Sequence, residues 1–274
     1  MHRLLRFVPF LALVVSPLAH ANDDPACDEV TVATIAHWAG VTGKLISRNK
    51  PGGVLAATAC KAMPNSPGTT IAAVAFDTNF DHADGEDGDH IKQVIALVQG
   101  GKVIAANRSF VEEDAATHFG SYRIDTAPYL LSPSVRAFGV VFDSDTVGPS
   151  CPDAAAEHEL TLWVRKEDDL VPVFGTNLYG WVTVDNLSCG PGIEGARSES
   201  AHMTIAIERT SSHGFADLSL TAQITQTQLK KGNYVDTGKR IVRKVLKYDG
   251  TSYGVDMFRS FWYPSTSPMH SAGD

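Results

Sequence analysis

An acidic stretch at residues 77–90, DTNFDHADGEDGDH, has the residue types of a metal site because it carries six carboxylates and no Lys or Arg. Calcium prefers oxygen ligands, and the loops that bind it supply them at alternate positions so that successive side chains converge on one ion. Asp77, Asn79 and Asp81 have this spacing, and Asp84 follows closely enough to fold back onto the same ion. The stretch therefore predicts a candidate calcium site and no other cofactor.

The same stretch departs from the helical calcium-binding hand. The sixth and twelfth positions, where that hand needs Gly and Glu, are His82 and Gly88. A calcium cage between two strands and a solvated hairpin loop, whose charges discourage aggregation at a sheet edge, remain as alternatives. In either case carboxylates of the loop can reach a basic surface, and four of them are the expected partner-binding residues: Asp84, Glu86, Asp87 and Asp89.

No complete catalytic motif is found in the sequence. A glycosidase needs one carboxyl group in apolar or aromatic surroundings, facing a second across a cleft. Neither the acidic stretch nor Glu112, Glu113 and Asp114 has a flanking Trp or Tyr. A Gly-x-Ser-x-Gly pattern occurs at 250–254 (GTSYG), but no helical segment follows it as a nucleophile elbow requires, so YDGTSY (248–253) predicts an Asp-Gly hairpin turn. We therefore expect no catalytic residues.

The first 21 residues have the three parts of a secretory signal peptide. Arg3 and Arg6 form the positive start, residues 7–15 the apolar stretch, and Ala21 ends a small-x-small cleavage site. The apolar stretch is shorter than the about 20 residues that span a bilayer. We therefore expect a periplasmic or secreted protein, cleaved near Ala21 and without membrane insertion.

The four cysteines lie outside the signal peptide. An even number in an exported protein predicts disulfide bonds, and four cysteines allow three connectivities. Their grouping favours the two pairs that each close a loop of fewer than 40 residues: Cys27–Cys60 and Cys151–Cys189.

The charge of the chain bears on its partners. Without residues 1–21 the chain has 21 Lys and Arg against 31 Asp and Glu, a net charge of −10. This balance disfavours nucleic acid and anionic membrane surfaces, where Lys and Arg must neutralise phosphates. It suits a cationic partner, although an acidic surface also serves solubility alone.

Short apolar or alternating runs separated by turn residues dominate the chain from residue 69 onward. In ELTLWVRK (159–166) the alternation predicts a half-buried strand, and QGGK (99–102) predicts a tight hairpin. Residues 29–49 are ambiguous between a helix and two strands, and their β-branched residues favour strands. The pattern predicts an antiparallel, all-β protein with few helices, built as a sandwich, barrel or propeller. Its expected core includes Phe76, Val94, Ile95, Ile104, Phe138, Val140, Leu162, Leu218 and Leu220.

The domain organisation expected from composition is simple. After the signal peptide (1–21), residues 22–262 form one all-β domain, and residues 263–274 form a disordered tail. The Gly- and Ser-rich stretch at 189–201 is a candidate internal boundary.

Two segments, HGFADL (213–218) and LKYDGTSY (246–253), and the Asp-rich loop beginning at Asp77 resemble the blades of FG-GAP/VCBS-type β-propellers of exported bacterial proteins. The resemblance covers about a third of the chain. It implies a propeller-like fold, with a β-sandwich as the alternative, and calcium-binding loops. Some relatives of this kind are periplasmic proteins that inhibit lysozyme-like cell-wall hydrolases or confer immunity to them.

The expected function is therefore that of a non-catalytic exported binding protein. Its expected partner is a cationic protein such as a lysozyme-like hydrolase, which it would inhibit or against which it would give immunity. The alternative is an exported hydrolase with an unrecognised active site. That alternative requires a concave pocket with two or more converging polar groups.

Overall fold

The structure is a computed structural model that describes residues 25–78, 90–114, 117–146, 148, 150, 152–185, 194–254 and 261–264. The predicted signal peptide, residues 79–89 of the acidic stretch and the cysteines at 151 and 189 lie outside these residues. The described chain forms one helix followed by twelve strands: α1 (Glu29–Ala39), β1 (Lys44–Ser47), β2 (Gly53–Ala62), β3 (Thr69–Asp77), β4 (His90–Gln99), β5 (Lys102–Glu112), β6 (Phe119–Asp125), β7 (Phe138–Ser144), β8 (Ala154–Lys166), β9 (Asp169–Asp185), β10 (Arg197–Ser212), β11 (Phe215–Lys230) and β12 (Asn233–Leu246). Apart from α1 the protein is all-β, as the alternating pattern predicted.

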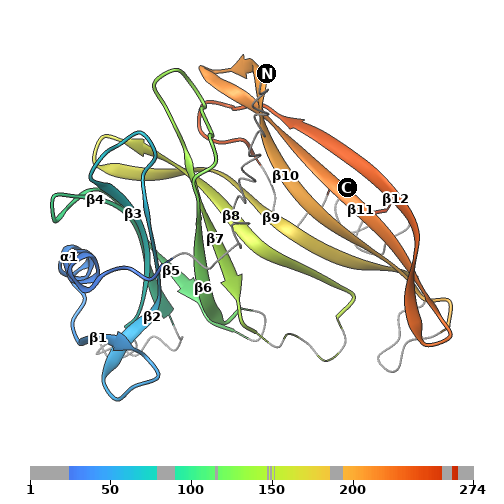
Figure 1. Cartoon of the computed structure of the whole chain (residues 1–274), viewed down its shortest axis with the longest axis horizontal. Helices are drawn as coiled ribbons and strands as arrows, with labels where there is room; N and C mark the ends of the chain where they lie inside the picture. The colour runs from blue at the N-terminus through green and yellow to red at the C-terminus, as the bar shows by residue number, and fades with distance from the viewer. Residues whose placement is uncertain are drawn as a thin grey trace, which may run out of the picture.

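The twelve strands belong to one open sheet. Its main path runs β1-β2-β3-β4-β5-β9-β10-β11-β12, and β6-β7-β8 branches from β9 (Figure 1). Most neighbours are antiparallel, but β1–β2 and β5–β9 are parallel, and β5–β9 rests on the single pair Ala106–Asp169. The strict antiparallel prediction was therefore wrong at these two places, and the described residues show no propeller.

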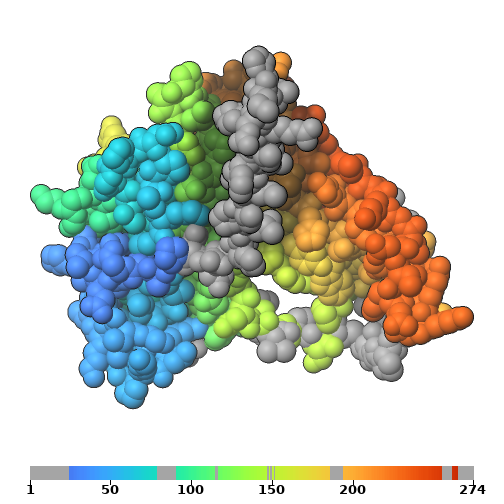
Figure 2. All heavy atoms as spheres, in the orientation of Figure 1, coloured from blue at the N-terminus to red at the C-terminus, as the bar shows by residue number. Residues whose placement is uncertain are grey.

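The sheet folds into layers that pack around three clusters of buried hydrophobic residues. The helix α1 covers one face of β3–β5, and the other face of β2–β5 packs against β6–β8. The long strands β8–β12 curve around a third cluster, which contains Trp262 from the end of the described chain. The first strands and the last strands thus form opposite sides of the molecule, blue to cyan and orange to red in Figure 2.

Residues 29–39 form a helix, so the preference for strands there was wrong. The Asp28 carboxylate caps the helix by accepting hydrogen bonds from the Thr31 backbone N–H and hydroxyl, each at 2.8 Å. Gly40 ends the helix with a φ of 66°, a left-handed conformation that glycine adopts without strain. One apolar face, which includes Val32 and Ile35, is buried on the sheet. Capping and burial outweigh the weak strand preference of the β-branched side chains.

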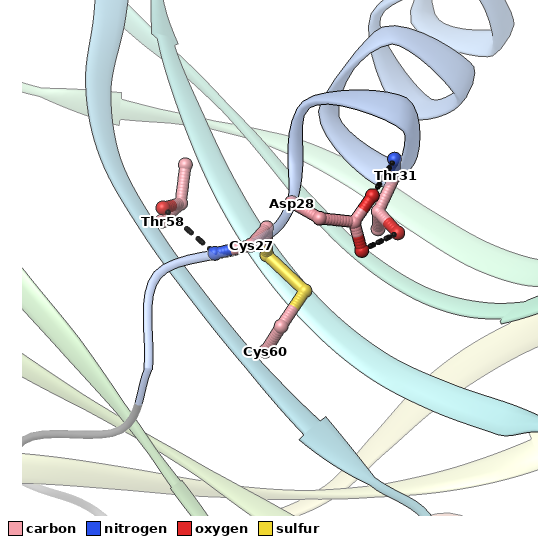
Figure 3. Close-up of a disulfide and its surroundings, with 5 residues drawn as sticks. All are labelled: Cys27, Asp28, Thr31, Thr58 and Cys60. Atoms are coloured by element: carbon pink, nitrogen blue, oxygen red, sulfur yellow. Dashed lines mark hydrogen bonds between the residues drawn. A yellow bond between two sulfur atoms is a disulfide. The ribbon is translucent and has the colours of Figure 1, made fainter.

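The predicted disulfide between Cys27 and Cys60 is confirmed (Figure 3). It joins the segment before α1 to β2, with an S–S distance of 2.11 Å and a sequence separation of 33. Backbone contacts support the same join, because the Cys60 N–H donates to the Pro25 carbonyl at 3.0 Å. The second predicted pair, Cys151–Cys189, lies outside the described residues.

Residues 160–164 of strand β8 are largely buried on both faces, where the alternation predicted a half-buried strand. Leu160, Leu162 and Val164 join the cluster inside the curved strands, whereas Trp163 packs in the cluster between β2–β5 and β6–β8. The strand has a protein layer on each side, which a pattern of one apolar and one mixed face does not reveal. The other predicted core residues are buried except Ile104, which is partly exposed.

Two further sequence predictions concern connections. The β4–β5 hairpin is confirmed, and Gly100 and Gly101 both adopt the positive φ angles that its turn requires. The candidate boundary at 189–201 overlaps β10, which begins at Arg197 and pairs with β9 in the same sheet. Residues 189–193 lie outside the described chain, so the boundary stays a prediction.

Candidate functional site: a cleft between two layers of the sheet

A cleft of about 260 Å³ lies between β4–β5 and β6–β8. The two layers are joined through the short β5–β9 contact at Ala106 and Asp169 and by a hydrogen bond of 3.1 Å from the Asn107 side chain to the Leu170 carbonyl. Away from this join the layers are held by side chains alone. We call the space the inter-sheet cleft; its lining residues are Gln93, Ile95, Val111, Glu112, Thr117, Tyr122, Val140, Phe142, Glu159, Thr161 and Trp163.

The apolar part of the cleft continues the hydrophobic core between the layers. Ile95, Val140 and Trp163 are buried members of that cluster. Phe142 lies beside them, with its ring centroid 4.9 Å from that of Phe119 and 6.2 Å from that of Tyr122. These rings give the cleft a rigid aromatic wall of the kind that favours the body of a small ligand or an inserted side chain.

A hydrogen-bonded pair crosses the cleft. The Tyr122 hydroxyl on β6 donates to the Gln93 side-chain carbonyl on β4 at 2.6 Å, and the Gln93 amide donates to the Ser109 hydroxyl at 3.0 Å. Burial raises the pKa of Tyr122 well above its usual value, and the nearby charge of Glu159 adds to this effect. Tyr122 therefore stays protonated and acts as a hydrogen-bond donor across the cleft.

Glu159 is the chemically distinctive residue of the cleft. The alternation of β8 places Glu159, Thr161 and Trp163 on the cleft side, opposite Leu160 and Leu162. The Glu159 carboxyl group forms no hydrogen bond or ion pair with any residue that the structure describes, although the side chain is only partly exposed. Burial raises its pKa, because the charged form has lost water without gaining a partner. A mostly buried, unpaired carboxyl group in a cleft is a typical feature of a functional site.

Trp163 supplies a second unused polar group. Its side chain lines the cleft and is buried, and within the described chain its indole Nε1–H has no acceptor. A buried donor without an acceptor carries an unfavourable free energy of about 1–3 kcal/mol. The cleft therefore combines an aromatic wall with a carboxyl acceptor and leaves an indole donor unsatisfied nearby.

The cleft opens at an edge of the molecule that is rich in carboxylates. We call the residues Asp77, Glu112, Glu113, Asp114, Asp143 and Asp145 the acidic edge; they lie at the neighbouring ends of β3, β5 and β7. Glu112 is exposed and lines the mouth of the cleft together with Thr117.

Arg48 and two histidines organise the acidic edge. The Arg48 guanidinium donates to both oxygens of Glu113, at 2.9 and 3.1 Å, and the Phe119 N–H donates to the same carboxylate at 2.6 Å. Burial alone would raise the pKa of Glu113, but these hydrogen bonds outweigh burial and lower it. His118 pairs with Asp145, and His158 contacts Asp143 at 2.5 Å. The Arg48 guanidinium balances part of the acidic charge, and the three pairs together fix the rim of the cleft.

Of the calcium ligands and partner-binding residues predicted from the sequence, only Asp77 lies within the described chain. Asp77 ends β3 and lies 3.9 Å from the Arg48 guanidinium. The other predicted calcium ligands and partner-binding residues lie outside the described chain: Asn79, Asp81, Asp84, Glu86, Asp87 and Asp89. Within the described ranges no group of three or more His, Cys, Asp or Glu side chains is arranged to hold a metal ion.

The GTSYG pattern begins in a turn over residues 249–252, but the described chain forms no hairpin there, so only the turn of the predicted Asp-Gly hairpin is confirmed. The Asp249 carboxylate accepts hydrogen bonds from the backbone N–H groups of Thr251 and Ser252, at 2.7 and 2.8 Å. The neighbouring Tyr253 is buried in the core, where its hydroxyl donates to the Ala216 carbonyl at 2.6 Å. This segment therefore packs against the curved part of the sheet.

Glu159 was not predicted as a site residue, although the strand that carries it was predicted. The aromatic surroundings of Glu159 come from β6, β7 and its own strand, so only Trp163 is near it in sequence. The usable signal was a carboxylate in register with Trp163 in an alternating strand, which becomes informative only when both faces of that strand are known to be buried.

Comparisons with known proteins found no relative: no protein-family model, curated protein or solved structure matches this chain. In the part of the chain that the structure describes, no helix has the length and apolar character needed to cross a membrane.

Proposed function

We propose that this chain is a non-catalytic, exported binding protein whose inter-sheet cleft receives a cationic group of its partner. The observation that carries the proposal is the Glu159 carboxyl group, which is mostly buried, has a raised pKa and has no partner among the described residues. A cation placed beside it would restore the interaction that burial has removed and would return its pKa toward the usual range. The site is thus complementary to a positive charge.

The surroundings of Glu159 narrow the chemistry of that group. The aromatic wall formed by Phe142 and Trp163 suits the apolar stem of a lysine or arginine side chain, whose charged end would reach Glu159. The acidic edge around the mouth would attract a basic protein surface and accelerate its association.

The partner that we propose is a cationic protein such as a lysozyme-like hydrolase, whose activity the complex would inhibit. The disulfide between Cys27 and Cys60 supports an oxidising compartment. The signal-peptide pattern and the resemblance to exported bacterial proteins support export and this class of partner.

The test pairs the protein without residues 1–21 with a panel of cationic muramidases and measures both complex formation and lysis of cell-wall suspensions. We expect inhibition by the unmodified protein, and we expect Glu159→Gln to weaken the complex at least about tenfold. Glu157→Gln is the matched control, because Glu157 is exposed on the same strand and does not line the cleft. If no muramidase is bound, or if both variants bind equally well, the proposal is wrong.

Hydrolysis is the second candidate function, and the pair Glu159 and Glu112 is the observation that favours it. A carboxyl group with a raised pKa can act as a general acid, and a second carboxylate at the same cleft could act as base or nucleophile. Release of reducing ends from peptidoglycan or other glycans by the protein alone, lost in Glu159→Gln, would establish the enzyme in place of the binding protein.

Calcium binding by Asp77, Asn79, Asp81 and Asp84 is a separate proposal that rests on sequence spacing. An ion that binds only the folded state would stabilise it, and the stabilisation would grow with the logarithm of the ion concentration once that concentration exceeds the Kd. Melting in millimolar calcium and in chelator should then differ, and Asp81→Ala should remove the difference. Identical curves would identify the stretch as a solvated loop.

A further inference from the structure

A second charged surface lies on the strand at the far end of the sheet from α1. Residues 230–247 contain seven Lys and Arg and a single Asp, although the whole chain has a net charge of −8. We call these seven residues the basic strand cluster: Lys230, Lys231, Lys239, Arg240, Arg243, Lys244 and Lys247. Most of them belong to β12 or flank it.

Strand β12 is an edge of the sheet. It pairs with β11 along its length, from Asn233 to Leu246, and no other described strand pairs with it. It forms the orange-red margin of the molecule in Figures 1 and 2. One row of its backbone N–H and C=O groups is therefore available for another strand.

Two members of the basic strand cluster already have partners within the fold. Arg240 pairs with the buried Glu199 and donates to the Trp262 carbonyl at 2.5 Å, and Arg243 pairs with Glu208. The five lysines are exposed and form no ion pair with any described carboxylate. Their positive charge is thus available to an external partner.

Apolar side chains are exposed on the same strand. Tyr234, Ile241 and Val245 are 65%, 72% and 49% exposed. The pairing of Ile241 with Gln223 and of Val245 with Ser219 places both side chains on the outer face. On the same face Arg243 lies between them, and Lys239 lies next to Ile241. Lysines alone would serve to protect an edge strand from aggregation, but such protection does not call for exposed Ile and Val among them.

We propose that β12 is a docking edge for an extended acidic segment of another protein, which adds to the sheet as a further antiparallel or parallel strand. Backbone hydrogen bonds would supply affinity, and carboxylates of the segment would meet the lysines while its apolar residues contact Ile241 and Val245. A second copy of this chain does not fit through β12 itself, because pairing two such strands would bring the positive charges of both clusters together. Nucleic acid would use the lysines but neither the backbone edge nor the apolar side chains.

This surface is independent of the inter-sheet cleft and of the proposed function. The cleft attracts cations at the ends of β3, β5 and β7, whereas β12 attracts anions at the other end of the strand order. The protein could therefore hold one partner at each end.

The test measures fluorescence anisotropy of a labelled peptide that repeats Glu-Glu-Val-Val, long enough to pair with all of β12, against the protein without residues 1–21. In an added strand this repeat alternates Glu and Val on each face, as β12 alternates basic and apolar side chains on its outer face. We expect saturable binding that weakens as salt is raised. Lys239→Glu/Lys244→Glu should weaken binding at least about tenfold, because it reverses one charge on each face of the strand. Lys50→Glu/Lys102→Glu changes the net charge equally at exposed positions away from β12 and should leave binding unchanged.

A second peptide separates strand addition from simple charge attraction. Methylation of alternate backbone nitrogens keeps every carboxylate but removes N–H donors that the added strand needs, so its binding should fall at least about tenfold. Equal binding of the two peptides would reduce the edge to an electrostatic surface and overturn the proposal. Absence of binding, or a concentration-dependent dimer that Lys239→Glu/Lys244→Glu dissociates, would also overturn it. Melting temperatures of both double variants, expected to match the unmodified protein, show that the variants fold.

Discussion

The Tyr122 hydroxyl donates a hydrogen bond of 2.6 Å to the Gln93 side chain and so joins β6 to β4 across the inter-sheet cleft. The two strands have no backbone hydrogen bonds to each other, because β6 pairs with β7 and β4 pairs with β3 and β5. This side-chain bond, together with the buried rings beside it, fixes the separation of the two layers at the site.

Tyr122→Phe removes that bond and keeps the ring. We expect a loss of about 1 kcal/mol in the free energy of unfolding, because the Gln93 carbonyl is left without its donor. Urea denaturation measures the loss. Tyr234→Phe is the control, since Tyr234 is 65% exposed and forms no hydrogen bond to the described part of the chain; a similar effect of both changes would contradict the bridging role.

Glu159→Gln should make the protein more stable at neutral pH. The folded state raises the pKa of Glu159 above that of the unfolded chain, so the folded state binds its proton more tightly. Stability contributed by this group is therefore fully present below the unfolded pKa of about 4.3 and is lost as pH rises through the folded pKa. Gln does not titrate, so the advantage of the variant should appear above that range and vanish below about pH 4.

The measurement for Glu159 is the free energy of unfolding as a function of pH. Glu157→Gln provides the comparison, because Glu157 is exposed on the same strand and does not line the cleft. A variant at Glu159 that is less stable than the unmodified protein at neutral pH would show that the carboxylate is satisfied in the folded state.

Sequence patterns predicted the strands well because alternation and turn residues are local. The β4–β5 hairpin follows from Gly100 and Gly101, and the buried residues of β3 and β4 follow from their apolar runs. The parallel contact between β5 and β9 could not be predicted, because it joins residues 63 positions apart through one pair, Ala106 and Asp169. The helix α1 was missed because its stability comes from the Asp28 cap and from packing on the sheet.

The candidate site was less predictable than the fold. Charge density in the sequence pointed to residues 77–90, whereas the distinctive carboxyl group, Glu159, is a single acid in an apolar strand. Its pKa is raised because Tyr122, Phe142 and Trp163 exclude water from it, and two of these three come from other strands. Burial of that kind is a property of the packed layers and has no local pattern.

Arg48→Met should destabilise the protein by about 3 kcal/mol, because it leaves the buried Glu113 carboxylate without its cation. The side chains of Arg48 and Glu113 are only 16% and 9% exposed. In the unmodified protein Glu113 has a lowered pKa, so its contribution is present above the unfolded pKa and is lost as pH falls through the folded pKa. In the Arg48→Met variant, burial should raise the pKa of Glu113. The stability contributed by this group should then be lost as pH rises.

Denaturation at several pH values tests both the size and the reversed sign. Arg197→Met breaks an exposed pair with Asp185 and should destabilise the protein much less than Arg48→Met does, because solvent screens the exposed pair. The double variant Arg48→Met/Glu113→Gln should recover part of the lost stability, since it also removes the carboxylate that Arg48→Met leaves without a cation. Equal costs for Arg48→Met and Arg197→Met would show that the pair at the acidic edge is exposed in solution.

Removal of the disulfide by Cys27→Ala/Cys60→Ala should lower the free energy of unfolding by about 3 kcal/mol, mainly because the unfolded chain is no longer restrained across 33 residues. The sheet should persist, because the buried face of α1 and the Cys60–Pro25 backbone hydrogen bond do not need the sulfur atoms. Hydrogen exchange should therefore accelerate at α1 and the adjoining part of β2 well before it accelerates at β9–β11. Uniform acceleration over the whole sheet would mean that the bond stabilises the whole molecule and does not act mainly by holding α1 to the sheet.

A reducing agent added to the double variant then tests the second predicted pair, because further destabilisation requires a disulfide between Cys151 and Cys189.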